Sequence, residues 1–498
     1  MSDAHSLPPT LGLIGSVIIV AALGSGLIQR SRLPQVGAFL ALGAILGPYG
    51  LDVLSIGLDS PIFQVVATLS LTFVLFTDAV TLNLKEVKEH WRLALVVLGP
   101  GTLITALVLG LAAHLLLGLA WPLAIILAAG LASTDPVLLR GILQRRDLPA
   151  SARQALQLES GLNDIILLPM VLLAMTIGNL HGPELSKMLL RLFLLGPGAG
   201  VLVGFLAVAA MEMLRKKTGI RRDYESIYSI GVAMAAYAAG EMLHGSGFLA
   251  AFAAGLTINW MDVELCDCFV EYGETTTEVA LLFCFVLLGA SLIWTGLTVL
   301  SPAVIAFTFL ALTVRTLVLL ISLHRVPRRE KWLIAWFGPR GLSTLLLVLV
   351  PIFAHTPDAA SLFPVAALAA LASVLVHGGS MALLPAPPRG PADDRIELDE
   401  LAELEDAILL DSRTDRSYEE SEQTVSGAHR VHPDRPVEEV RRLGLPQDAP
   451  LVVFCTCPSE ETSGRVTETL RRAGWTKTRA LVGGWRALEK SELPLRAK

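Results

Sequence analysis

The chain has 498 residues, of which 53% are hydrophobic and 17% are charged, with a mean hydropathy of +0.61 and a formal net charge of -6. A composition this apolar excludes a soluble globular protein, and the length exceeds that of one ordinary domain. The charges are concentrated in residues 389–498, so the sequence predicts a polytopic, all-α membrane part followed by a soluble tail, with no nucleic-acid partner.

Long apolar segments fill the first part of the chain. A membrane-spanning helix needs about 20 largely apolar residues, and we predict thirteen, at residues 11–28, 34–52, 61–82, 93–118, 121–143, 152–178, 187–212, 224–243, 245–261, 277–295, 300–323, 331–353 and 362–384. The eighth and ninth are joined only by a short His-Gly-Ser-Gly segment and are two spans or one broken helix. Residues 1–10 lack the features of a cleaved signal peptide, so we expect the first span to stay in the membrane.

Basic residues predict the orientation of these spans. They follow spans one, three, five, seven and eleven, for example at Arg30, Arg92 and Arg145, and the loops between are poor in lysine and arginine. Basic loops stay on the cytoplasmic side of a membrane. We therefore expect a multi-pass protein of the inner cell membrane with its N-terminus outside and its tail in the cytoplasm.

Proline interrupts two of the spans. The fifth contains Asp135-Pro136 and the twelfth contains Gly338-Pro339-Arg340-Gly341. Proline removes a helical hydrogen bond and pushes the preceding residue out of helical geometry. The two spans are seven apart, so matching breaks predict an inverted repeat of spans one to six and eight to thirteen. Paired interrupted helices point to a transport site near the bilayer midplane.

The sixth span carries a polar face. Ser160 and Asp164 are four residues apart on one side of the helix, and Glu159 and Asn163 form the neighbouring pair. Ionisable groups at this depth are rare and usually functional. Hydroxyl, carboxylate and amide oxygens together suit a small hard cation, and a carboxylate that must release its proton first makes the exchange obligatory. The alternative is a structural hydrogen-bond cluster between helices.

The break in the fifth span adds further oxygen ligands. We expect the helix to open before Pro136, which frees backbone carbonyls and leaves Asp135 beside them. A simple proline kink, with Thr134 bonding the freed groups, is the alternative.

Two arginines lie within the membrane segments, at Arg315 in the eleventh span and Arg340 in the twelfth. Each needs a partner. Glu159 pairs with one of them, which leaves Asp164 as the titrating group, or Arg340 neutralises the ends of the interrupted helices. Asp78, near the inner end of the third span, belongs either to the site or to the membrane interface.

Four motifs together resemble a known family. STDPVLLRGIL, LESGLND, HGSGFLAAFAAGL and FGPRGLSTLLLVLVP are similar to the electroneutral Na⁺/H⁺ exchangers, the NhaP-type members of the monovalent cation/proton antiporter superfamily, over residues 10–385. The resemblance implies a homodimeric antiporter without a cofactor that exchanges Na⁺ for H⁺ by alternating access, with Li⁺ or K⁺ as other substrates; a K⁺/H⁺ antiporter is the alternative. Gly161 and Gln157 depart from the usual pattern, which has Leu and often an acid there.

The same resemblance implies roles for individual residues. Asn163, where electrogenic relatives carry a second Asp, implies one H⁺ exchanged per cation. The implied ion and proton ligands are Asp164, Asp135, Ser160 and the Thr134 carbonyl, and the implied polar core is Asn163, Glu159, Arg315 and Arg340.

The tail begins after a proline-rich linker at residues 386–394 and reads as an α/β domain over 395–498. We expect strands at 407–410 and 451–454 and a helix at 463–473. ILLDSRTDRSY, VSGAHRVHPDRP, LVVFCTCPSEETSGRVTETLRRAGW and ALVGGWRALEKSELPL resemble a rhodanese-like domain.

The resemblance places Cys455 after the central strand, where that fold holds its sulfur-carrying thiol. Glu460 and Glu461 put negative charge where an anion would bind. We therefore expect a regulatory or inert tail, with a membrane-tethered sulfurtransferase or sulfur sensor as the alternative.

Overall fold

The structure, a computed structural model, describes residues 35–82, 91–143, 145, 148–177, 187, 189–217, 222–261, 267–324, 326–383, 395–413 and 417–497, the last two ranges with short gaps. The chain divides into two compact units, Met1–Leu384 and Pro385–Lys498. Apart from Gly15, the predicted first span at 11–28 lies outside the described residues, and so does the linker at 386–394.

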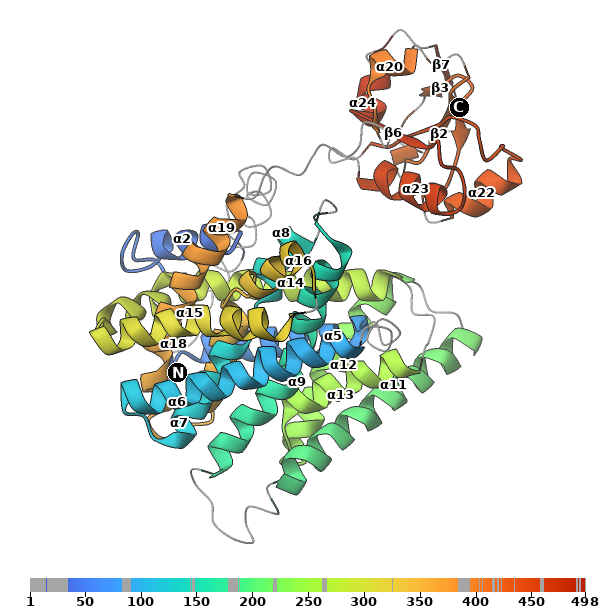
Figure 1. The fold of residues 1–498 in the computed structure, drawn as a ribbon. Helices are drawn as coiled ribbons and strands as arrows, with labels where there is room; N and C mark the ends of the chain where they lie inside the picture. Colours follow the sequence, from blue (N-terminus) through green and yellow to red (C-terminus); the bar gives the residue numbers. More distant parts are fainter. Residues whose placement is uncertain are drawn as a thin grey trace. The chain divides into compact units, whose positions relative to one another are not determined.

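Helices make up the described part of the first unit (Figure 1). In chain order they are α2 Gln35–Leu46, α3 Pro61–Thr81, α5 Trp91–Val96, η1 Val97–Ile104, α6 Thr105–Leu117, α7 Trp121–Ala132, α8 Pro136–Leu143, α9 Ala150–Ile177, η2 Arg191–Leu195, α11 Gly196–Lys217, α12 Arg222–Met242, α13 Gly247–Trp260, α14 Asp267–Ala290, η3 Leu292–Val299, α15 Pro302–Ser322, α16 Arg328–Trp336, α17 Leu342–Phe353, η4 Ala359–Ser361, α18 Leu362–Ser373, η5 Val374–Gly378 and α19 Gly379–Ala382.

Helices lie at the second to thirteenth predicted spans. By length and apolarity, seven of the described helices can cross a membrane, or eight if α14 and η3, bent by 47° at their junction, form one span. The predicted number of thirteen therefore stays a prediction. The eighth and ninth predicted spans are two separate helices, α12 and α13, because residues 243–246 turn the chain between them.

Proline and serine mark where several helices begin. Pro61, Pro136 and Pro302 open α3, α8 and α15, at a position where a helix has no use for the missing N–H. The hydroxyl groups of Ser246 and Ser301 accept hydrogen bonds from the first turns of α13 and α15, at 3.4 and 3.2 Å. Local sequence thus marks where these helices begin.

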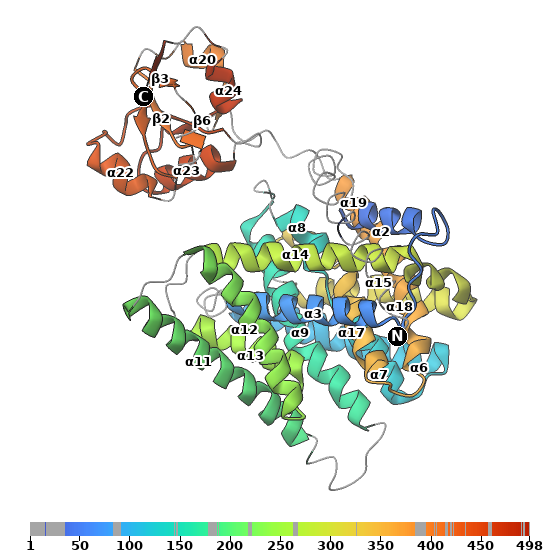
Figure 2. The ribbon, with the colours of Figure 1, turned by 180° about the vertical axis from the view of Figure 1, so that it is seen from behind.

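The helices pack in two groups. The first bundle comprises α2, α3, α11, α12, α13 and α14, and the second comprises α6, α7, α9, α15, α17 and α18. Figure 2 shows α11, α12 and α13 of the first bundle side by side. Glycine permits the closest approaches there: a Cβ on Gly47, directly after α2, would lie 2.0 Å from the Ala290 carbonyl oxygen at the end of α14.

The second unit contains a five-stranded parallel sheet in the order β1-β6-β5-β2-β4 and an antiparallel pair, β3 and β7. The strands are β1 Arg395–Ile396, β2 Ile408–Asp411, β3 Gln423–Val425, β4 His429–Arg430, β5 Leu451–Phe454, β6 Arg479–Leu481 and β7 Leu495–Ala497. The helices are α20 Leu398–Ala402, α22 Pro436–Arg442, α23 Glu461–Arg472 and α24 Gly484–Glu489. Apolar clusters cover both faces of the sheet, and β5 at its centre is fully buried, as expected of a parallel sheet.

Candidate functional site

Two interrupted helices meet in the membrane unit. α7 ends at Ala132 and α8 begins at Pro136, while α16 ends at Trp336 and α17 begins at Leu342. The prolines predicted both breaks. The non-helical segments bond directly to each other, because the N–H of Asp135 donates to the Pro339 carbonyl at 2.9 Å.

The carboxylate of Asp135 caps the two helices that follow these breaks. Its Oδ1 accepts the N–H groups of Val137 and Leu138 at 2.8 and 3.4 Å, and its Oδ2 accepts the N–H of Leu342 at 2.5 Å. The first N–H groups of a helix have no partner within it and carry partial positive charge. A single buried carboxylate therefore stabilises the N-termini of both α8 and α17.

Arg340 bonds the last carbonyl groups of α7, whereas Asp135 bonds the first N–H groups of the helices that follow. Its Nη1 donates to the carbonyl oxygens of Ala132 and Ser133 at 2.9 and 3.1 Å, and its backbone N–H donates to the Ser373 hydroxyl at 2.7 Å. The last carbonyls of a helix lack helical partners and carry partial negative charge. Of the two roles that the sequence left open for Arg340, the structure shows this one.

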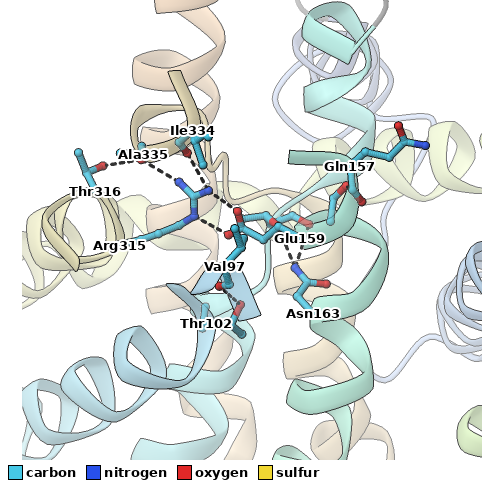
Figure 3. A network of polar contacts seen from close by, with 12 residues as sticks. Val97, Thr102, Gln157, Glu159, Asn163, Arg315, Thr316, Ile334 and Ala335 are labelled. Atoms are coloured by element: carbon cyan, nitrogen blue, oxygen red, sulfur yellow. Dashed lines mark hydrogen bonds and ion pairs between the residues drawn. The ribbon is translucent and has the colours of Figure 1, made fainter. Parts of the chain in front are cut away.

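Glu159 pairs with Arg315, as Figure 3 shows. Nε of Arg315 donates to Oε1 at 2.5 Å and Nη2 donates to Oε2, so the pair is bidentate and both side chains are buried. The same guanidinium donates to the carbonyls of Ala335 and Ile334, at 2.8 and 3.0 Å, in the last turn of α16. Arg315 thereby joins α9 to the end of α16.

The polar face of α9 lies against the break after α7. The hydroxyl of Ser133 donates to Oδ1 of Asp164 at 3.0 Å. Nδ2 of Asn163 donates to the hydroxyl and carbonyl oxygens of Thr134 at 2.9 and 3.4 Å, and its own Oδ1 is buried without a described partner. The expected residues of the two elements therefore lie together.

Burial separates this region from bulk water. Asp135 is 0% exposed, Asp164 5% and Ser160 4%. The hydroxyl of Ser160 donates to the Gln157 carbonyl at 3.3 Å, which leaves its lone pairs available as an acceptor. Two carboxylates, hydroxyl oxygens and freed carbonyls in one buried place are the ligand types that alkali and other hard cations take.

The sequence interpretation missed two residues of this region. Ser133 directly precedes the expected ligands in the STDP motif, and a hydroxyl beside a helix break is the signal that could have identified it. Ser373 accepts from Arg340 and contacts His377 Nδ1 at 2.9 Å. It comes from a distant span, so the sequence offers no local signal for that contact.

Cys455 lies in the second unit, directly after β5. Its thiol is buried at 1% exposure and lies 3.4 Å from the Ser463 hydroxyl in α23, while its carbonyl accepts the N–H of Trp485 at 2.8 Å. Glu460 lies outside the described residues, and the side chain of Glu461 does too.

Nearby, Arg413 forms a buried bidentate pair with Asp411 and stacks 4.1 Å from the Trp485 ring.

Comparison with known proteins agrees with this division. The family model of the transmembrane sodium/hydrogen exchanger matches residues 17–384, and that of the rhodanese-like domain matches residues 394–491. The K(+)/H(+) antiporter NhaP of Alkalimonas amylolytica is 26% identical over 410 residues, covering 80% of this chain and 71% of that protein. The K(+)/H(+) antiporter NhaP2 of Shewanella sp. (strain MR-4) is 28% identical over 389 residues, covering 76% and 67%.

One solved structure has the same fold. The sodium proton antiporter MjNhaP1 from Methanocaldococcus jannaschii matches with a TM-score of 0.61 at 21% identity, covering 76% of this chain and 99% of that one. At this identity the likeness establishes the fold of the membrane unit alone.

Proposed function

The chain belongs to the sodium/hydrogen exchanger family and is a multi-span cation/proton antiporter of NhaP type with a C-terminal rhodanese-like domain, and we propose that it exchanges one Na⁺ for one H⁺ at Asp164. The observation that carries this proposal is the buried carboxylate of Asp164 facing the break at Ser133, one helical turn from Ser160. A carboxylate enclosed in this way carries either a proton or a cation, because its charge needs compensation at this depth.

The proposed Na⁺ ligands are Asp164, Asp135, Ser160 and the carbonyl of Thr134. Asp135 accepts three backbone N–H groups, and a carboxylate offers about four lone-pair sites, so capacity for a cation is left. The hydrogen bond from Asn163 to the Thr134 hydroxyl supports the orientation of the unwound segment.

We propose one proton per cation because the two other buried carboxylates of this region, Glu159 and Asp135, already accept strong hydrogen bonds. Glu159 accepts two hydrogen bonds from Arg315 in a charge-assisted bidentate pair, whereas Asp135 accepts three backbone N–H groups. Asn163 cannot titrate. In this proposal Asp164 is the carboxylate that releases one proton and binds one cation in each transport cycle.

Alternating access is proposed as a movement of the second bundle against the first. The second bundle contains α7 and α17 of the two interrupted helices together with α9, whereas the first bundle has close backbone contacts such as that at Gly47. We propose that helices outside the second bundle form a homodimer interface, that the N-terminus lies outside, and that the tail is cytoplasmic and regulatory.

Potassium is the second candidate substrate. Curated relatives at 26–28% identity are named K(+)/H(+) antiporters, whereas the solved relative is a sodium proton antiporter. The residue types alone do not separate the two ions, because selectivity depends on cavity size and ligand geometry.

The test uses purified full-length protein in vesicles that carry an imposed pH gradient. Na⁺, Li⁺ and K⁺ are added in turn, and dissipation of the gradient is followed with a pH-sensitive dye. We expect dissipation by Na⁺ in the wild type and none in Asp164→Asn, because the amide cannot exchange a proton. Unchanged exchange in Asp164→Asn would defeat the assignment.

The sulfurtransferase alternative is tested separately at Cys455. If the membrane part only anchors a sulfur enzyme, then Cys455→Ser should retain full exchange in vesicles and lose the cellular effect of the protein. The burial of this thiol and of its neighbour Ser463 favours the regulatory tail.

A further inference from the structure

The helix of the last predicted span changes its winding beside the second break. α18 ends at Ser373, and the π-helical turn η5, Val374–Gly378, follows directly. Turns of this kind are rare and occur frequently at functional sites. Ser373 and His377 are buried, at 0% and 1% exposure, and Oγ of Ser373 lies 2.9 Å from Nδ1 of His377. The wider turn therefore coincides with two buried polar side chains that contact each other.

One peptide group of the second break lies between Ser373 and Asp135. The carbonyl of Pro339 accepts the N–H of Asp135 at 2.9 Å, and the N–H of Arg340 donates to Oγ of Ser373 at 2.7 Å. This carbonyl and this N–H belong to the same trans peptide, in which they point in opposite directions. Asp135 and Ser373 therefore hold the peptide group from its two sides, and a rotation of it would break both hydrogen bonds.

His377 keeps Ser373 in place as an acceptor. A hydroxyl group has one proton and two acceptor lone pairs. Ser373 either donates its proton to Nδ1 of His377 or accepts one from it, according to the tautomer of the ring. In both cases one lone pair stays available for the N–H of Arg340. The histidine thus orients the serine without competing for that hydrogen bond.

The ring of His377 is itself held by the end of α16. It packs against the ring of Trp336, the last residue of α16, with 5.3 Å between the ring centroids. Nε1 of Trp336 donates to the Ser380 hydroxyl at 2.9 Å, and that hydroxyl donates to the His377 carbonyl at 2.7 Å. This helix therefore contacts the second break at the end of α16 and again at Arg340.

The peptide group between Pro339 and Arg340 is connected to two of the proposed cation ligands. Asp135, which bonds its carbonyl, is one of them. The side chain of Arg340 bonds the carbonyls of Ala132 and Ser133, and the next carbonyl along the chain is that of Thr134, the other proposed ligand. A shift of this peptide group would therefore move both ligands.

From these contacts we propose that Ser373 and His377 are positioning residues that set the ion preference of the cation site. They fix the peptide group between Pro339 and Arg340, and so keep the ligand oxygens of the neighbouring break at the spacing that a small ion requires. Discrimination between ions of equal charge depends on ligand geometry and on the rigidity of the site. This inference rests on the proposed antiport function and adds to it two residues that do not touch the ion.

The test measures the half-saturating concentrations of Li⁺, Na⁺ and K⁺ for exchange by the purified full-length protein in vesicles. Ser373→Ala removes the hydroxyl. We expect the half-saturating Na⁺ concentration to rise by about tenfold, the effect of one lost hydrogen bond to a buried group. The rise should be larger for Li⁺ and smaller for K⁺, because a loosened site favours small ions less. A loss of stability alone would lower the maximal rate equally for the three ions.

Three further variants separate positioning from folding. Ser373→Thr keeps the hydroxyl and should retain the wild-type ratios between the ions. His377→Phe keeps a ring against Trp336 but lacks Nδ1, so it should change the ratios in the same direction as Ser373→Ala. The two substitutions together should change them no further than Ser373→Ala alone, because both act through one hydrogen bond.

Ser70→Ala is the matched control. Ser70 is also buried at 0% exposure, and its hydroxyl donates to the Ala280 carbonyl at 3.1 Å, between α3 and α14 of the first bundle. This variant loses a comparable hydrogen bond between helices away from the break. Its ion ratios should therefore equal those of the wild type.

The outcomes separate the two proposals. A wild-type protein without cation-driven proton movement defeats the antiport function, and this inference with it. Exchange in the wild type with unchanged ion ratios in Ser373→Ala or in His377→Phe overturns the positioning role alone. Effects of these two substitutions that add in full, or an equal change of the ratios in Ser70→Ala, also overturn it.

Discussion

Glu159 and Asp164 lie five residues apart on one helix and have different environments. Arg315 holds both oxygens of Glu159, whereas Ser133 donates one hydrogen bond to Asp164. A bidentate guanidinium partner stabilises the ionised carboxylate far more than a hydroxyl does. In the proposed function, the difference between a fixed charge at Glu159 and an exchangeable one at Asp164 comes from the side chains of neighbouring elements.

Removal of Arg315 should destabilise the membrane unit. In Arg315→Met, Glu159 is left as a buried charge without its partner, which typically costs about 3 to 5 kcal/mol. The carbonyls of Ile334 and Ala335 lose their donor as well. We expect a clear fall in the thermal unfolding temperature of the purified protein in detergent.

The controls identify the cause of that fall. Arg92→Met changes an exposed arginine on α5 and should have little effect. Glu159→Leu combined with Arg315→Met removes both charges and should recover much of the stability. An Arg315→Met protein as stable as the wild type would show that the pair is not a structural link.

At this scale the sequence predicted the residue types but not the partners. Glu159 needed an arginine, and both Arg315 and Arg340 satisfied that requirement on composition alone. The choice depends on how α15 and α17 pack against α9, which no local pattern encodes. The roles of Asp164, Asp135, Ser160 and Thr134 as ligands stay predictions that the vesicle experiments test.

The interrupted helices are the elements on which the proposed site depends, and buried charged side chains bond the backbone groups at their broken ends. Asp135 caps both second halves, and Arg340 and Arg315 bond the last carbonyls of α7 and α16. Non-helical backbone inside a membrane is tolerated where such partners are supplied. Proline fixed the positions of the breaks in the sequence, but their mutual contact is visible only in three dimensions.

Gly341 allows Asp135 to approach the start of α17, because glycine has no Cβ. A Cβ at this position would lie 2.0 Å from Oδ2 of Asp135, well inside van der Waals contact. Gly341→Ala should therefore displace the carboxylate, uncap α17 and abolish exchange in vesicles while the protein still inserts. Retained exchange at the wild-type rate would mean that the cap is dispensable.

Gly231→Ala provides the comparison for that variant. Gly231 lies in α12 with open space around it, so alanine meets no obstacle there. Alanine favours a helix over glycine by about 0.8 to 1 kcal/mol. We expect unchanged exchange and equal or higher thermal stability.

At the scale of the membrane unit, the inverted repeat that the two breaks predict stays a prediction, and the contacts between helices agree with it. If spans one to six correspond to eight to thirteen, the contact of α2 with α14 corresponds to the contact of α13 with α3, and both contacts are present. The contact of α8 with α9 likewise corresponds to that of α17 with α18. Apart from Gly15, the first predicted span lies outside the described residues, so the contacts of α12, the eighth span, are not compared with those of its counterpart.

The length of the apolar runs, about 20 residues each, predicted helices at the second to thirteenth spans. It did not predict the two bundles, since their helices are apolar on nearly every side and carry no clear face. Close backbone contacts at glycine, such as Gly47 against Ala290, select the neighbours instead. In the tail, the strand at Leu451–Phe454 was located correctly because a fully buried strand is apolar throughout.

A single exchangeable carboxylate has a consequence for the complete transport cycle. When Asp164 is mostly protonated, Na⁺ must displace one proton, so the half-saturating Na⁺ concentration should rise about tenfold for each unit that the cytoplasmic pH falls. The maximal rate should not change in this range. At high pH the rate should fall, because too few protons remain to replace the bound cation.

Vesicles with the membrane potential clamped at two values provide the measurement. One Na⁺ for one H⁺ moves no net charge, so the rates at the two potentials should coincide. A hundredfold change per pH unit, together with rates that depend on the potential, would mean that a second carboxylate also exchanges a proton. The other buried carboxylates here are Asp135 and Glu159, so the same measurement on Asp135→Asn and on Glu159→Gln would identify the second one as the variant that returns the slope to tenfold.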